Sequence, residues 1–561
     1  MNVALPVEIL TTILVDCIVD HPDYTAAPHR ATYTYLADIS LAISHACRLW
    51  RNIALSPGGR RLWAHAPLRH KPACVDAFMQ RSHPLPVLLK FEAILIDDFD
   101  PMKSYLPAVF KALEYRTRVG SLLLRLIVDE YSDYPDEHKQ EYYDACATMS
   151  NILDEHTFPT LEYLSWRSFI KEDGEEISGN VFTSDVPRSL RRLDLATITT
   201  TSRNPILRAP LTSLVLERCG CWLGVDDFIS TLHNMPLLET LAISSEGGPE
   251  TFEELESSTR HQRRSVTLPR LSRLALHDTL ENTVLLFAYL HVPVTCRIDM
   301  APSYDHYRPI EDSRQYWEHW SVLRTALRAH FEPFAFERIV VSGIGDRSDR
   351  FLISASSATL PTMDLNFVCH PEEFCLTDMH LLRTLRDLLL LPFLSRASTI
   401  VAQDIRVLQP LLYQFSDHDE GQSIASPFSA VRNAIVADAA TDDIGRALSD
   451  PSLLPALQTI EVRQMLVDDG RDTESSQWKF GALLRGLWAR GRLDSVQAIQ
   501  TVNLRHCAVV KEAVDALAAS VHARISWDGL CVYPDRNVSK KIARLDDQAE
   551  HVGILAQILD R

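Results

Sequence analysis

Pro210-Leu211-Thr212-Ser213-Leu214-Val215-Leu216 joins a proline to leucines at the spacing L-x-x-L-x-L, and this phrase decides the fold. Its last three positions alternate, so Leu214 and Leu216 face one side of a short strand and Val215 faces the other. The phrase also follows prolines at Leu161–Trp166, Leu190–Leu195, Leu238–Ile243 and Leu271–Leu276, and successive prolines lie 23 to 33 residues apart. This spacing is close to the roughly 20–29-residue period of leucine-rich repeats.

The same pattern extends in both directions along the chain. The phrase recurs at Leu457–Val462 and Ile499–Leu504, and strand-like runs occupy residues 86–93, 120–128, 338–342, 362–368, 398–403 and 430–437. Because stacked repeats bury their apolar faces against their neighbours, we predict an α/β fold: an irregular leucine-rich-repeat solenoid over residues 68–535, a curved parallel sheet with helices on its outer side. The equivalent inward positions are Leu193, Leu214, Leu241 and Leu274. An ordinary α/β sheet with leucine-rich strands is the alternative.

The first 67 residues carry a helical pattern instead. Pro6 suits the first position of a helix, where its missing N–H would have no intrahelical partner. Apolar residues then recur at helical spacing, at Leu5, Ile9, Leu10, Ile13, Leu14, Cys17 and Ile18, and again in a second short helix at Ile43, Cys47, Trp50 and Ile53. We predict a helical module over residues 1–67 and a terminal helical tail over residues 536–561.

The N-terminal module resembles an F-box, the adaptor-binding module of cullin-based ubiquitin ligases. The agreement lies in Leu5-Pro6 with Glu8-Ile9, in the stretch Ser44–Trp50 and in the late Trp63. The phrase Arg81–Pro86 before an apolar strand also resembles the segment after the F-box in many fungal F-box proteins with irregular leucine-rich repeats, a kind common in basidiomycetes. One departure is the segment His21–Leu36, which is longer and more polar than the usual link between F-box helices and bears on adaptor affinity. A simple helical cap over a larger domain is the alternative interpretation.

The resemblance implies partners and contact residues. It places Leu5, Pro6, Ile9, Leu10 and Ile13 on or near the contact with a Skp-type adaptor, and through that adaptor a cullin scaffold. Trp50 is expected to pack inside the module. The chain is then the substrate receptor of an SCF-type E3 ubiquitin ligase, and the solenoid holds an unidentified protein target. The alternative function is a leucine-rich-repeat binding scaffold without a ligase role.

Composition limits the other classes of function. The formal net charge of −18 argues against a general nucleic-acid surface, which needs clustered cations. No apolar run is long enough to span a bilayer and no signal peptide is visible, so we expect an intracellular protein, cytoplasmic or nuclear, with no membrane partner. Cys219-Gly220-Cys221 and Cys369-His370 with Cys375 lack the spacing of a zinc site, so no metal is expected. Gly343-Ile344-Gly345 lacks the third glycine of a dinucleotide loop.

No local motif requires catalysis, so we expect neither enzyme activity nor a cofactor, although a catalytic triad can assemble from distant positions. Target recognition is expected on the outward strand positions and the residues just past the final leucine: Arg192, Asp194, Glu217, Arg273, His277, Glu461, Arg463, Asn503 and Arg505. The charged insertions at residues 129–141, 171–180 and 246–265 are typical of solvated loops or binding tails. The aromatic segment Ala301–Trp320 either packs over the solenoid or forms a binding rim.

Overall fold

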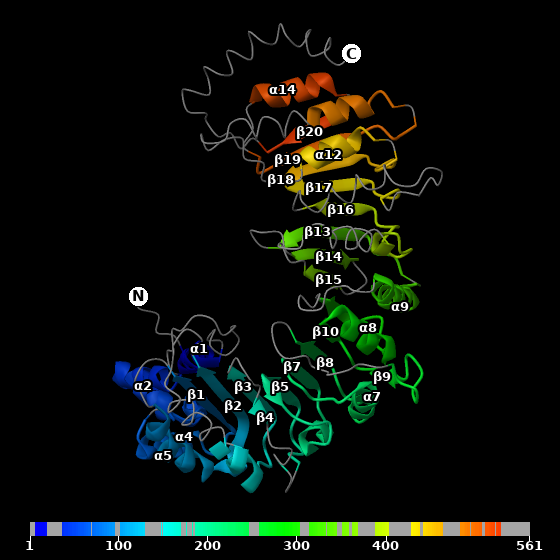
Figure 1. Cartoon of the computed structure of the whole chain (residues 1–561). Coiled ribbons are helices and arrows are strands. Elements are labelled where there is room, and N and C mark those ends of the chain that lie inside the picture. The colour runs from blue at the N-terminus through cyan, green and yellow to red at the C-terminus, as the bar shows by residue number, and fades with distance from the viewer. Residues whose placement is uncertain are drawn as a thin grey trace, which may run out of the picture. The chain divides into compact units, whose positions relative to one another are not determined.

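The computed structural model divides into two compact units, Met1–Pro302 and Ser303–Arg561 (Figure 1). It describes residues 6–19, 36–68, 70–95, 101–128, 147–148, 150–169, 175–176, 182, 186–245, 257–302, 313–332, 334–344, 350–357, 362–368, 387–402, 428–437, 441–450, 452–463, 483–493, 495–507, 511–521 and 523–528. The predicted tail at 536–561, most of the link at His21–Leu36 and the group Cys369-His370 with Cys375 lie outside these residues.

The first unit begins with a small helical module. Its elements are α1 (Val7–Val19), α2 (Leu36–Ala46), α3 (Arg48–Leu55), η2 (Pro57–Trp63) and α4 (Pro72–Ser82). The second helix that we predicted is therefore two helices, which meet at Cys47. Cys47 has an extended backbone, and its Sγ accepts a hydrogen bond from the Trp50 N–H at 3.5 Å, so it caps α3. A cap that ends one helix and starts the next is invisible to a pattern that counts apolar spacing alone.

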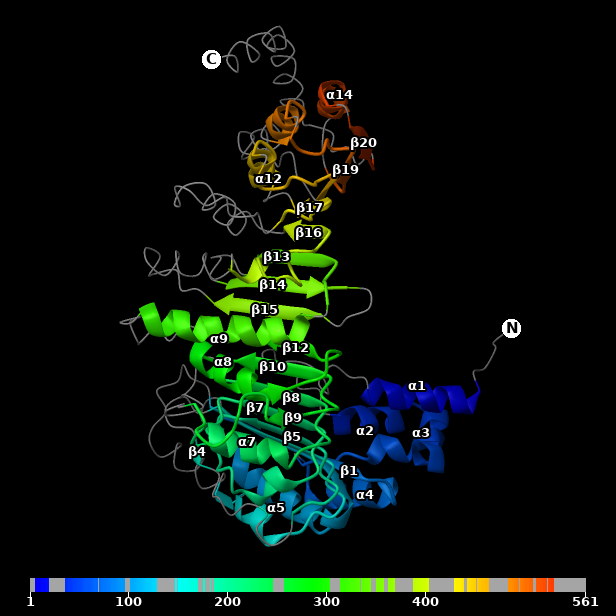
Figure 2. The same cartoon turned by 90° about the vertical axis from the view of Figure 1, so that its right-hand side faces the viewer.

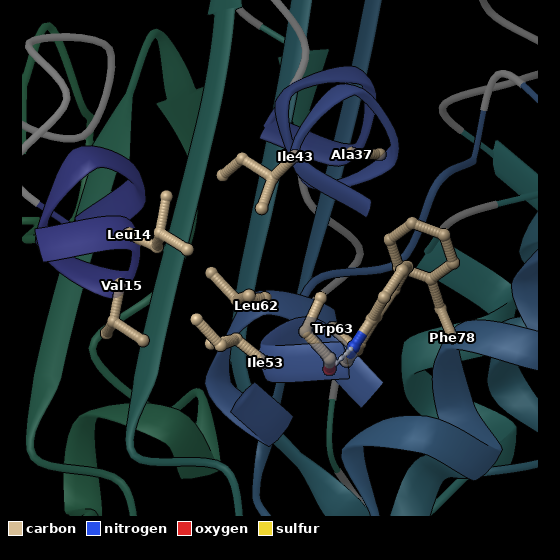
Figure 3. Close-up of a cluster of buried hydrophobic side chains, with 9 residues drawn as sticks. Leu14, Val15, Ala37, Ile43, Ile53, Leu62, Trp63 and Phe78 are labelled. Carbon is tan, nitrogen blue, oxygen red and sulfur yellow. Dashed lines mark hydrogen bonds between the residues drawn. The ribbon is translucent and has the colours of Figure 1, made fainter. Parts of the chain in front are cut away.

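The module has its own hydrophobic core. Figure 3 shows Leu14 and Val15 pointing from α1 toward Ile43, Ile53 and Leu62. The Trp63 indole packs edge-on against the Phe78 ring, with ring centroids 4.8 Å apart, and its N–H donates to the Ala54 carbonyl at 2.7 Å. Trp50 packs partly buried against this cluster, as predicted. Because Phe78 belongs to α4, the core extends past residue 67.

The main sheet of the first unit is parallel and sequential. Within it, strands pair in the order β1 (Val87–Leu95), β2 (Val119–Val128), β3 (Tyr163–Phe169), β5 (Arg192–Ala196), β7 (Ser213–Glu217), β8 (Thr240–Ser244), β10 (Arg273–His277) and β12 (Arg297–Met300). Leu193, Leu214, Leu241 and Leu274 lie opposite one another in register, and all four are buried. The predicted inward register is confirmed.

Helices cover the apolar face of this sheet. Helix α7 (Val225–His233) joins β7 to β8, α8 (Leu280–Tyr289) follows β10, and both lie on the same side of these strands in Figure 2. The remaining elements of the unit are α5 (Pro101–Leu113), the 3₁₀ turns η3 (Arg116–Arg118) and η4 (Pro205–Arg208), and the short strand pairs β4 (Glu175–Glu176) with β6 (Ile198–Thr199) and β9 (Val266–Thr267) with β11 (Leu290–His291). The other face of the sheet carries the outward side chains of each strand.

A recurring turn ends several strands. Thr197, Arg218 and His506 each directly follow a strand and adopt left-handed backbone angles, with φ of 57°, 54° and 53°. Two of the turns continue into a buried cysteine, whose thiol donates to a carbonyl of the neighbouring strand. Cys219, after β7, donates to the Leu195 carbonyl of β5, and Cys507, after β19, donates to the Val462 carbonyl of β18, each at 3.3 Å. These thiol contacts join each turn to the neighbouring strand of the sheet.

The second unit repeats the strand stacking with one change of direction. Its main sheet runs in the order β15 (Met363–Val368), β14 (Arg350–Ser356), β13 (Arg338–Ile344), β16 (Thr399–Ala402), β17 (Asn433–Ala437), β18 (Thr459–Arg463), β19 (Thr501–Arg505) and β20 (Arg524–Trp527). From β13 through β16 to β20 the pairing is parallel, whereas β13, β14 and β15 pair antiparallel. The predicted strands at 338–342, 362–368, 398–403 and 430–437 are present, whereas β14 and β20 were not predicted.

The helices that accompany this sheet include α9 (Ser313–Phe331), α12 (Thr441–Leu448) and α14 (Lys511–Ser520), and residues 483–490 are also helical. Helix α9 includes the end of the aromatic segment Ala301–Trp320, and Trp320 is 2% exposed. This burial agrees with the packing interpretation for that residue. Residues 303–312, which hold the first tyrosines of the segment, lie outside the described part of the chain. The two units together form an α/β fold with long, largely parallel, sequentially paired sheets.

Candidate partner-binding surfaces

The helical module presents apolar side chains that its own core does not use. Val7, Ile9 and Ile13 of α1 are 48%, 48% and 45% exposed, although Leu14 and Val15 of the same helix are buried. Ile9 and Ile13 are four residues apart and therefore lie on one helix face. Leu49 and Leu55 of α3 are exposed to a similar degree. Large exposed apolar residues grouped on one small module are typical of a protein interface.

The predicted adaptor residues have different surroundings. Pro6, Ile9 and Ile13 are exposed, whereas Leu10 is partly buried against the module core. Leu5 lies outside the described residues. The sequence pattern did not identify Leu49 and Leu55 as exposed residues. Their exposure could have been predicted, because both lie outside the apolar stripe that contains Trp50 and Ile53.

On the open face of the first sheet, one arginine joins two of the predicted target-binding acids. The Arg167 guanidinium, from β3, pairs with the Asp194 carboxylate of β5 at 2.8 Å and with the Glu217 carboxylate of β7 at 3.5 Å. The Ser165 hydroxyl donates to the same Asp194 oxygen at 3.3 Å. These contacts leave Asp194 buried at 9% exposure, so this residue offers little free surface. Burial lowers the pKa of Arg167, but the Asp194 charge and hydrogen bond and the Glu217 charge together raise that pKa above its ordinary value.

Arg167 was not among the predicted residues, although the rule that selected them includes it. Arg167 is the residue just past Trp166, the last apolar position of the first phrase, as Glu217 and His277 are in later strands. In register, Arg167 lies opposite Ala196, which in turn lies opposite Glu217. Applying the outward-position rule to every strand would have found it.

A second polar pair lies near the end of the same sheet. His277 Nε2 of β10 lies 3.3 Å from an Asp299 carboxylate oxygen of β12. Burial raises the pKa of Asp299, but the close contact with His277 and the positive charges of Arg297 and Arg273 bring that pKa below its ordinary value. Asp299 was also missed, because β12, with the sequence Arg297-Ile298-Asp299-Met300, does not carry the leucine phrase.

In the second unit, three of the predicted residues meet at one carboxylate. Glu461 of β18 accepts from the Arg463 Nε at 2.6 Å and pairs with the Arg505 Nε of β19 at 3.4 Å. Glu461 is 9% exposed, whereas Arg505 is exposed and Arg463 is half-buried. Asn503 lies opposite Glu461 in register. The cluster therefore exposes two guanidinium groups around one largely buried acid.

Arg192 and Arg273 remain at the starts of β5 and β10 in the first unit. Both side chains are exposed, and neither forms an ion pair with a carboxylate in the described part of the chain. Most of the predicted target residues are therefore ion-paired within the sheet, whereas Arg192 and Arg273 are exposed without an ion pair to a described carboxylate.

The buried cysteines have the chemistry of core residues. Burial raises the pKa of the Cys219 and Cys296 thiols to about 12, and burial also raises the pKa of Cys221. Thiols held protonated in this way are poor nucleophiles and poor metal ligands. Within the described ranges, no group of three or more His, Cys, Asp or Glu side chains is placed to hold a metal ion. No helix of the described ranges is both long and apolar enough to cross a membrane.

Comparison with known proteins adds no relative. No protein-family model matches the chain, and no curated protein matches it in sequence. The fold defines an α/β protein with long parallel sheets, one helix-covered face and one open polar face, preceded by a helical module with exposed apolar residues. Its function is therefore inferred from these residues and contacts.

Proposed function

We propose that this chain is the substrate-recognition subunit of a cullin-type E3 ubiquitin ligase. In this proposal the N-terminal helices are an F-box that docks a Skp-type adaptor, and the strands after them form an irregular leucine-rich-repeat solenoid that binds a protein target. The observation that carries the proposal is the division of α1 into a buried side, with Leu14 and Val15, and an exposed apolar side, with Ile9 and Ile13.

One further observation supports the docking role. The module core is complete without Ile9 and Ile13, so these side chains are available to a partner without unfolding the module. An isoleucine side chain that becomes fully buried contributes about 1.5–3 kcal/mol. Two such residues on one helix face are therefore enough to determine whether a partner binds.

The target-binding role is supported by the open polar face of the strands. This face lies opposite the helices in the alternating strand pattern and carries Arg192, Arg273 and Arg505 as exposed side chains. Exposed polar rows on a stacked sheet are typical of the binding surfaces of repeat proteins. Neither surface requires catalysis by this chain, in keeping with a receptor whose partners transfer ubiquitin.

The decisive experiment is binding of the full-length chain to a purified Skp-type adaptor, measured by calorimetry. Ile9→Asp combined with Ile13→Asp should weaken binding about a hundredfold or more, because two apolar contacts are lost and two charges enter the interface. Leu223→Asp is the matched control, since Leu223 is an exposed leucine of the first unit, at 86%, outside the helical module. Circular dichroism checks that each variant remains folded.

The outcomes separate the two candidate functions. Adaptor binding that is lost in the Ile9 and Ile13 variant but retained in the Leu223 variant supports the ligase receptor. A wild-type chain that does not bind the adaptor leaves the protein-binding scaffold without a ligase role as the function. An Ile9 and Ile13 variant that binds normally contradicts the contact assigned to α1.

A further inference from the structure

The open face of the first unit carries a row of arginines at the starts of its strands. The backbone register aligns residues of five consecutive strands, β5 to β12, across the sheet: Arg192, Ser213, Thr240, Arg273 and Arg297. All three arginines of this arginine row are exposed, and Ser213 and Thr240 between them are partly exposed. The row contains no acidic residue.

The acids of the same face are already engaged. Two residues further along the strands, Asp194 and Asp299 pair with Arg167 and His277 respectively. Glu217, at the next outward position of β7, also pairs with Arg167. Arg192 and Arg273 form no ion pair with any described carboxylate, so the positive charges of these two arginines are available to a partner, and Arg297 joins the row by its register and exposure.

Over residues 186–302 the sequence holds twelve arginines and thirteen Asp or Glu residues, so the positive charge is a feature of the strand starts and not of the whole region. Guanidinium groups bind carboxylates by paired, charge-assisted hydrogen bonds.

We propose that the arginine row binds an extended, carboxylate-rich segment of a partner protein that crosses the strands from β5 to β12. Neighbouring strands are roughly 4.8 Å apart, so Arg192 lies about 14 Å from Arg273 and Arg297 lies about 5 Å beyond. An extended peptide rises about 3.3 Å per residue, so the acid that binds Arg273 lies four positions along the peptide from the acid that binds Arg192. The hydroxyls of Ser213 and Thr240 lie between them, within the path of the peptide backbone.

The binding segment therefore has acids at positions i and i+4, with a further acid at i+5 or i+6. This inference names the class of target for the solenoid part of the proposed function, and it does not depend on adaptor binding. A chain that binds the acidic segment but no adaptor is a scaffold, and one that binds the adaptor but no acidic segment is a receptor with a different target site.

The test uses the full-length chain and a fluorescein-labelled ten-residue peptide with Glu at positions 3, 7 and 8 and with Ser, Thr and Gly elsewhere. Binding is followed by fluorescence anisotropy at low ionic strength. The row variant combines Arg192→Gln, Arg273→Gln and Arg297→Gln. The control variant combines Arg188→Gln, Arg208→Gln and Arg270→Gln, which removes three exposed arginines of the same unit outside the row. Thermal unfolding by circular dichroism compares the folded state of both variants.

The wild-type chain should bind the peptide, and a peptide with Gln in place of the three Glu residues should not bind. The row variant should lose about tenfold or more in affinity, and the control variant less than about threefold, since each exposed pair contributes modestly. A peptide with Glu moved to positions 3, 4 and 5 should bind more weakly than the spaced peptide. Equal losses in the two variants, or no binding of the spaced peptide to the wild-type chain, would overturn the proposal.

Discussion

The side chains of Asp299 and His277 show how a single pair gives this sheet a dependence on pH. The fold lowers the pKa of Asp299 below its ordinary value of 3.8, although burial alone would raise it. An aspartate with a lowered pKa stabilises the folded state above its ordinary pKa, and this contribution disappears as the pH falls through the lowered value. The relevant window therefore begins near pH 3.8 and extends below it.

Asp299→Asn should destabilise the chain at neutral pH by about 1 kcal/mol, because the carboxylate loses its close contact with His277 and its attraction to Arg297 and Arg273. The difference from the wild type should shrink at about pH 3, where the wild-type carboxylate is itself becoming protonated. Thermal unfolding at the two pH values measures both effects. Asp16→Asn is the control, since Asp16 is exposed and has no ion pair with a described residue. A destabilisation of Asp299→Asn that is the same at both pH values would contradict this account.

At the scale of the element, each strand of the first sheet depends on the apolar row that it shares with its neighbours. Leu214 is fully buried between Leu193 and Leu241, which lie opposite it in register. Leu214→Ala should therefore cost about 2–5 kcal/mol, as for buried leucines in general. Leu223→Ala, at a leucine that is 86% exposed, should change the stability by less than about 0.5 kcal/mol. Denaturant unfolding of the two variants compares these values, and similar losses would mean that the register is wrong.

The leucine phrase was sufficient to predict β3, β5, β7, β8 and β10, because alternation and spacing are local properties of the sequence. It did not predict β12 or β20, nor β14, which pairs antiparallel with β13 and β15 and lacks the phrase. It also did not predict which outward residues become buried. Asp194 and Glu461 were expected to line an open surface, but each is largely covered by the arginines that pair with it. Such pairing depends on residues of neighbouring strands, which lie 27 positions apart for Arg167 and Asp194.

At the scale of the whole molecule, the two proposed surfaces differ in their physical chemistry. The contact at Ile9 and Ile13 is apolar, whereas the contact at Arg192 and Arg273 is electrostatic and exposed. Dissolved salt screens exposed charges over about 10 Å at 0.1 M ionic strength but has little effect on apolar burial. The two binding events should therefore respond differently to the same change of solvent.

Raising the salt concentration from about 0.05 M to about 0.3 M should weaken binding of the acidic peptide roughly tenfold or more. The affinity for the adaptor should change by less than about threefold over the same range, because apolar contacts dominate that interface. Parallel titrations of one protein preparation measure both affinities. A peptide affinity that is insensitive to salt would indicate that apolar contacts, rather than the arginines, hold the peptide.

The left-handed residues Thr197, Arg218 and His506 have a consequence for protein engineering. A left-handed conformation costs a residue other than glycine roughly 1–2 kcal/mol, and the chain accepts this cost after three strands. Three unrelated side chains therefore occupy the left-handed position itself, and only the cysteine that follows Arg218 and His506 is shared between two of the turns. The exposed position His506 is accordingly a natural place for a thermostabilising glycine or asparagine, which would relieve the strain without disturbing the buried thiol of Cys507.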